Sequence, residues 1–153
     1  MKLFNKITQK DTTANTPSIF IAGPIMAMDG SRQDKWQRQA LKMLDDMGYE
    51  GHIYVPELTP EYTTNNIDWE VEHLTKAKCI MFWIPRDLKT LPAFTSNIEF
   101  GEWMNSGKVV LGFPPEAENM FYISYRAQKL GIPTFHTLEE TLHAAINMSL
   151  KKK

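Results

Sequence analysis

A carboxylate in the segment Thr95-Ser-Asn-Ile-Glu-Phe-Gly-Glu-Trp103 is the first candidate for chemistry in this chain. The segment follows an apolar run at 79–84 and a proline-bearing loop, so we expect Glu99 at the mouth of an α/β sheet, where a carboxylate can act as a nucleophile. The spacing also fits a simpler role, because Ser96-x-x-Glu99 matches a capping box at a helix start. Helix amides favour an ionised carboxylate in both roles, so spacing alone does not choose between them.

A second carboxylate, Glu70, lies one helical turn before Leu74 in the amphipathic segment that leads into the central apolar run. A helical glutamate is usually solvated, and the functional alternative is a contact with substrate. The neighbouring Trp69 fits either a core position or the floor of a pocket for a base. Asp68 is a typical N-cap residue and is predicted to begin this helix.

The loop after the first apolar run is a candidate anion site. Gly23 and Pro24 end that run, and glycine allows a backbone to approach a ligand closely. Ser31 and Arg32 stand where the next helix is expected to begin, so amides, a hydroxyl and a guanidinium could hold a phosphate together. An ordinary strand-to-helix turn explains the same residues equally well. Arg86, just after the central run, fits either a crevice or a surface ion pair.

Composition and missing motifs exclude several classes. The chain has no Gly-x-Gly-x-x-Gly or Walker sequence, which argues against dinucleotide hydride transfer and nucleoside triphosphate hydrolysis. Its net charge of −1 and lack of a basic stripe predict no polymeric nucleic-acid partner. A single Cys79 and isolated histidines predict no internal disulfide, no metal site and no cofactor. No apolar run approaches the ~18 residues of a membrane span, so we expect a cytoplasmic protein without a membrane partner.

Apolar runs alternate with amphipathic segments along most of the chain. This pattern predicts an α/β domain at 18–150, between a flexible N-terminal extension at 1–17 and a basic tail at 151–153. The predicted fold is flavodoxin-like, three-layer α/β/α, with a five-stranded parallel sheet whose ligands bind beyond the carboxyl ends of the strands. Strands are predicted at 18–22, 52–55, 78–84, 108–112 and 133–135, and helices at 34–47, 68–77, 96–106, 121–130 and 137–150.

Seven short motifs between residues 20 and 112 together resemble the nucleoside 2-deoxyribosyltransferase-like family, and the resemblance extends over about residues 19–142. The most specific are the Trp-Glu helix and the Asn-x-Glu-Phe-Gly segment. The motifs are Phe20-Ile-Ala-Gly-Pro24, Trp36-Gln-Arg38, Val55-Pro-Glu57, Asp68-Trp-Glu70, Phe82-Trp-Ile-Pro-Arg-Asp87, Thr95-x-Asn97-x-Glu99-Phe-Gly101 and Ser106-Gly-Lys-Val-Val-Leu-Gly112.

The resemblance implies roles for individual residues. Glu99 matches the glutamate that attacks the anomeric carbon of a 2-deoxyribonucleoside, and Glu70 matches an acidic residue that contacts the sugar. The loop at 23–32 corresponds to the sugar or phosphate side of the pocket. Two features depart from the family pattern: residues 92–94 replace an aspartate that usually precedes the nucleophile, and the first strand has no aromatic hydroxyl.

The predicted function is cleavage or transfer at the N-glycosidic bond of 2-deoxynucleosides or their 5′-monophosphates through a covalent deoxyribosyl intermediate on Glu99. The substrate-binding prediction comprises Gly23, Pro24, Ser31, Arg32, Asp68, Trp69, Arg86 and Asn97. The resemblance also implies a homo-oligomer. Two alternatives are a non-catalytic nucleotide-binding sensor with the same fold and a flavodoxin-like electron carrier.

Overall fold

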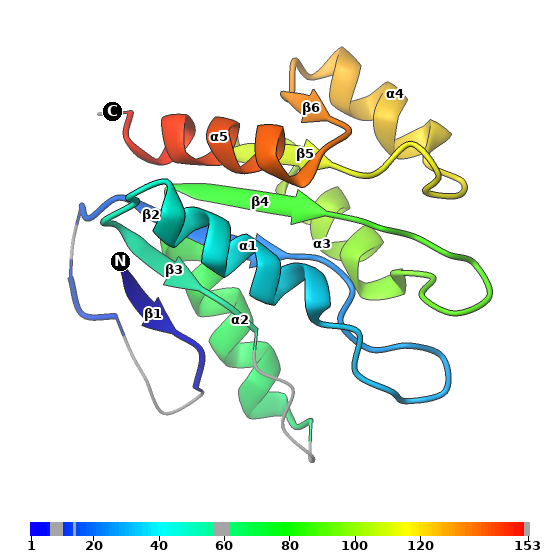
Figure 1. Cartoon of the computed structure of the whole chain (residues 1–153), viewed down its shortest axis with the longest axis horizontal. Helices are drawn as coiled ribbons and strands as arrows, with labels where there is room; N and C mark the ends of the chain where they lie inside the picture. The colour runs from blue at the N-terminus through cyan, green and yellow to red at the C-terminus, as the bar shows by residue number, and fades with distance from the viewer. Residues whose placement is uncertain (7–10, 14, 57–61, 152–153) are drawn as a thin grey trace.

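The computed structural model describes residues 1–6, 11–13, 15–56 and 62–151. It contains a six-stranded parallel sheet in the order β1-β3-β2-β4-β5-β6, covered by helices on both faces (Figure 1). The predicted three-layer α/β architecture is confirmed. The strands are β1 (Lys2–Phe4), β2 (Ser18–Ala22), β3 (His52–Tyr54), β4 (Cys79–Trp83), β5 (Val109–Gly112) and β6 (Thr134–Phe135).

The prediction of five strands was wrong, because β1 lies inside the segment assigned to the N-terminal extension. Its residues pair in parallel with β3, and Phe4 is buried in the core. Asp11 is also buried, and its carboxylate accepts a hydrogen bond from the hydroxyl of Tyr54 and lies 2.7 Å from Nδ1 of His52. A three-residue strand is too short to show a period in the sequence, and pairing with β3 supplies what its length does not.

The central strands alternate their side chains between two separate hydrophobic clusters, one on each face of the sheet. The first packs under α2 (Thr64–Lys76), α3 (Phe94–Trp103) and α4 (Phe121–Lys129), and the second under α1 (Lys35–Asp46) and α5 (Leu138–Ser149). In β2, for example, Phe20 enters the first cluster and Ile21 the second. Continuous apolar strands of this kind are typical of a sheet buried on both faces.

Two helices begin earlier than the sequence predicted. Helix α2 begins after Thr63, whose backbone amide donates to Oδ1 of Asn66 at 2.9 Å in a capping box, so Asp68 lies inside the helix. Helix α3 begins after Ala93, which has a left-handed backbone with φ of 60°, so Ser96 and Glu99 do not form the capping box that was one of the two roles open to this spacing. Both glutamates therefore lie beyond the first turn of their helices.

The sheet order creates a crevice between the carboxyl ends of β2 and β4. These central strands are neighbours, but the chain leaves β2 toward α1 on one face and leaves β4 toward α3 on the other. Such a switch point is where open α/β sheets bind ligands. We therefore expect a ligand site between the loops that follow these two strands.

Candidate active site

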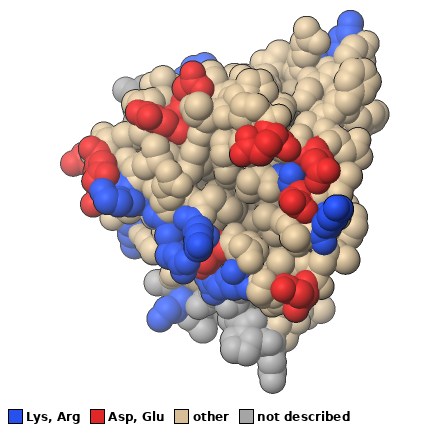
Figure 2. Space-filling model, turned by 45° about the vertical axis from the view of Figure 1, so that its right-hand side comes forward, with Lys and Arg blue, Asp and Glu red and all other residues tan. Residues whose placement is uncertain are grey.

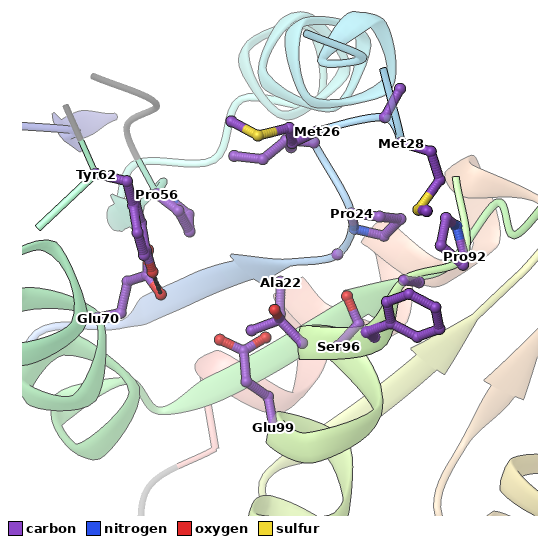
Figure 3. A pocket seen from close by; sticks show the side chains of 16 residues that line it. Ala22, Pro24, Met26, Met28, Pro56, Tyr62, Glu70, Pro92, Ser96 and Glu99 are labelled. Carbon is purple, nitrogen blue, oxygen red and sulfur yellow. Dashed lines mark hydrogen bonds between the residues drawn. The ribbon is translucent and has the colours of Figure 1, made fainter. Parts of the chain in front are cut away.

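A pocket of about 430 Å³ opens at this switch point, a volume suited to a small-molecule ligand. Its lining comes from residues 22–28 after β2, Pro56 after β3, Tyr62, Glu70 of α2, residues 92–96 at the start of α3, and Glu99. Figure 3 shows Glu70 and Glu99 reaching the pocket from two different helices. The structure therefore brings the two predicted carboxylates into one cavity.

Most of the remaining wall is apolar. Met26 and Met28 from the loop after β2 and Pro92 and Phe94 from the start of α3 all line the pocket, and Figure 3 shows Met28 on the side of Pro92. The two loops are joined by a hydrogen bond from the amide of Met28 to the carbonyl of Thr90 at 2.9 Å. Among the described residues of the lining, Glu70 and Glu99 are the only ones with charged side chains. An apolar pocket with a few convergent polar groups is the usual form of a small-molecule site.

Burial changes the acidity of both carboxyl groups. It raises the pKa of Glu99 to about 8, with further contributions from the negative charges of Glu70 and Glu102. It also raises the pKa of Glu70 to about 7, against the opposing effect of a hydrogen bond from Tyr62. The expectation that helix amides favour ionised Glu99 was wrong, because helix-end effects fade beyond the first turn and desolvation dominates here.

Tyr62 is a pocket residue that the sequence analysis did not select. Its hydroxyl donates to the carboxylate of Glu70, with oxygen–oxygen distances of 3.2 and 3.1 Å. Tyr62 precedes α2 in the long connection after β3, and a carboxyl-end loop is the one signal that could have found it. No periodicity or motif marks a lone tyrosine in such a loop.

Gly23 and Pro24, which were predicted to bind substrate, line the pocket, and they also have structural roles. A Cβ atom on Gly23 would collide with the carbonyl oxygen of Trp83 at the end of β4. The carbonyl of Pro24 accepts a hydrogen bond from the indole nitrogen of Trp36 at 2.8 Å. Glycine is therefore required here for the close approach of β2 and β4 at the switch point.

Ser31 and Arg32 do not line the pocket. The guanidinium of Arg32 pairs with Asp34 at 2.5 Å, and both Ser31 and Arg32 are exposed. The amide of Ser31 donates to Oδ1 of Asp29 at 2.9 Å, which closes the turn. The structure therefore favours the ordinary strand-to-helix turn over the predicted anion site.

Asp68 and Trp69 also lie outside the pocket lining. Asp68 is exposed on α2. Trp69 is buried in the core, where its ring stacks on His73 with a centroid distance of 4.0 Å. Of the two roles open to this tryptophan, the structure therefore supports the core position.

Arg86 and Asn97 act together at the side of the site. Arg86 is buried, and its guanidinium donates to the side-chain oxygen of Asn97 and, at 3.1 Å, to the carbonyl of Asn119. These contacts join α3 to the loop before α4. Neither side chain lines the pocket, so the pair supports the helix that carries Glu99.

The fold and this pocket define an α/β domain with a small-molecule pocket at its switch point, and comparison with known families shows which family the chain belongs to. Residues 16–117, about two thirds of the chain, match the family described as nucleoside 2-deoxyribosyltransferase like. The chain therefore belongs to the nucleoside 2-deoxyribosyltransferase-like family. No curated protein matches it. In the part of the chain that the structure describes, no helix is both long enough and apolar enough to span a bilayer.

Proposed function

We propose that this protein cleaves or exchanges the N-glycosidic bond of 2-deoxynucleosides through a covalent intermediate on Glu99. The observation that carries the proposal is the pair of half-buried carboxyl groups, Glu70 and Glu99, in one largely apolar pocket of a family member. Retaining glycoside cleavage needs one ionised carboxylate as nucleophile and one carboxylic acid as proton donor. The raised pKa values of the two groups leave one proton on the coupled pair between about pH 7 and about pH 8, and the reactive form is the one in which Glu70 holds that proton.

The proposed reaction has two steps. An ionised oxygen of Glu99 attacks C1′ and forms an ester, while the C1′–N bond breaks and its electron pair leaves with the base. Glu70 in its acid form gives a proton to the departing base. A second base or a water then attacks C1′, the ester bond breaks, and Glu70 takes up the proton that this nucleophile loses. A second base gives transfer and water gives hydrolysis.

The charges of the pocket support an unphosphorylated nucleoside as the substrate. The described lining residues include no lysine, arginine or histidine, and Arg32 pairs with Asp34 outside the pocket. On the face drawn in Figure 2, several basic and acidic side chains lie next to one another. A 5′-phosphate inside the pocket would therefore meet two carboxyl groups and no cation from the described residues.

Deoxynucleoside 5′-monophosphates are expected to be poorer substrates than the free nucleosides. The missing bonds to a charged group correspond to about 1.5–3 kcal/mol, or roughly 10- to 100-fold in kcat/KM. Arg32→Ala should leave the ratio between the two substrates unchanged. Steady-state assays with matched pairs, such as deoxyadenosine and its monophosphate, measure this ratio. A preference for the monophosphate that disappears in Arg32→Ala would restore the predicted phosphate site.

The activity is expected to follow a bell-shaped pH profile with its optimum between about pH 7 and about pH 8. At lower pH both carboxyl groups hold protons and no nucleophile is present, whereas at higher pH both are ionised and no acid remains. The two limits belong to the coupled pair. A profile of kcat/KM from pH 5 to 10 measures them. An optimum near pH 5 would contradict the effect of burial on these groups.

Release of free base from a panel of 2-deoxynucleosides, with and without a second base, tests the proposal directly. Intact-mass spectrometry of the protein during turnover should detect a deoxyribosyl adduct, and the adduct should be absent from Glu99→Ala. The rival is a non-catalytic sensor with the same pocket. Thermal stabilisation by deoxynucleosides without any base release would favour that rival. The homo-oligomeric state and the cytoplasmic location stay predictions.

A further inference from the structure

Tyr62 forms one wall of the pocket and contacts one of its two carboxyl groups. Its hydroxyl oxygen lies 3.2 Å from Oε1 and 3.1 Å from Oε2 of Glu70, as the dashed contact in Figure 3 shows. A phenol has a single proton to donate, so the two carboxylate oxygens share it. The hydroxyl of Tyr62 therefore contacts both carboxylate oxygens of Glu70 and restricts rotation of the carboxylate group.

The contact is specific to one of the two carboxyl groups. Within the described ranges, Tyr62 is the only hydrogen-bond partner of Glu70, and Glu99 has none. Burial and the negative charges of both glutamates raise the pKa of Tyr62, so the phenol keeps its proton throughout the neutral range. The hydroxyl is therefore a permanent donor, and a donor stabilises the ionised form of the carboxylate that it contacts.

We propose that Tyr62 is a positioning residue that holds the Glu70 carboxyl group in one orientation toward the pocket. The kinetic part of this inference rests on the proposed function, whereas the geometric part does not. The titratable groups that face Glu70 from the described elements of the pocket are Tyr62, before α2, and Glu99, from α3.

The bond from Tyr62 stabilises the ionised form of Glu70, which is the form that takes up a proton in the second proposed step. With this bond, Glu70 loses its proton at lower pH than it otherwise would. The same bond keeps the carboxyl group in one orientation, which is needed for proton transfer to and from a base held above the sugar.

Tyr62→Phe removes the hydroxyl and retains the ring, so it tests the bond separately from the pocket wall. We expect kcat to fall by about 10- to 100-fold, the range for a lost hydrogen bond to a charged group, while KM changes by less than about threefold. The low-pH limb of kcat/KM should move to higher pH. Tyr122→Phe, at an exposed tyrosine outside the pocket, should leave kcat, KM and the pH profile unchanged.

A titration that needs no turnover separates this inference from the proposed function. The carboxyl carbon of Glu70 is observed by NMR in protein labelled at glutamate carboxyl carbons, with its resonance assigned from Glu70→Gln. Its titration midpoint should rise in Tyr62→Phe and stay unchanged in Tyr122→Phe. An unchanged midpoint in Tyr62→Phe would overturn the inference, even in an active enzyme. A raised midpoint in a protein that releases no base would retain the geometric part and reject the proposed function.

Discussion

Glu99→Ala is expected to abolish base release from 2-deoxynucleosides, with a loss of about 10⁴-fold or more in kcat. The physical reason is that the proposed ester forms on this carboxylate, and the other carboxyl group of the pocket comes from a different helix. Chromatographic measurement of free base during turnover checks the result. Glu102→Ala is the matched control, because Glu102 lies on the same helix, is exposed and does not line the pocket. Full activity in a folded Glu99→Ala protein would remove Glu99 from the mechanism.

The same variant should remain folded and should gain stability in alkaline solution. Burial raises the pKa of Glu99 from 4.5 to about 8, so the folded protein binds this proton more tightly than the unfolded chain does. The free energy of unfolding therefore decreases as pH rises through this window. Glu99→Ala removes this loss of stability. The difference in melting temperature, variant minus wild type, should therefore increase from pH 6 to pH 9. Circular dichroism melting curves across this range distinguish a lost catalytic group from a lost fold.

Glu70→Gln is expected to reduce kcat by about 10²–10⁴-fold, which is less than the loss from Glu99→Ala. Glutamine keeps the shape and accepts the bond from Tyr62, but it cannot exchange a proton with the base. The loss should be smaller for nucleosides whose base is a good leaving group, because such a base needs less protonation. Assays with one poor and one good leaving group, compared at the same pH, measure this difference.

Glu72→Gln is the matched control for Glu70→Gln. Glu72 lies two residues further along α2, pairs with Lys76 at 2.7 Å and does not line the pocket. Its replacement should leave turnover within about twofold, because an ion pair of this exposed kind contributes little to stability. Equal kinetics of Glu70→Gln and Glu72→Gln would show that Glu70 has no catalytic role and is an ordinary solvated glutamate.

The sequence by itself determined the architecture and the two carboxylates of the site. Four of the six strands, β2 to β5, are mostly apolar and fully buried, and their alternation with amphipathic segments is readable because burial on both faces leaves no other pattern. Glu70 and Glu99 were found because each stands in a specific motif. Their common pocket also followed from topology, because neighbouring parallel strands end at the same edge of a sheet.

Only the tertiary structure decided how the other polar residues are used. Arg32 and Trp69 matched binding residues by type and spacing. In the structure, Arg32 pairs with Asp34, and Trp69 packs in the core. Tyr62 has no motif, and its role arises only where a connection after β3 meets α2. The acidity of Glu99 was likewise unreadable, because desolvation depends on what packs around a carboxyl group, and residues far apart in the chain supply that packing.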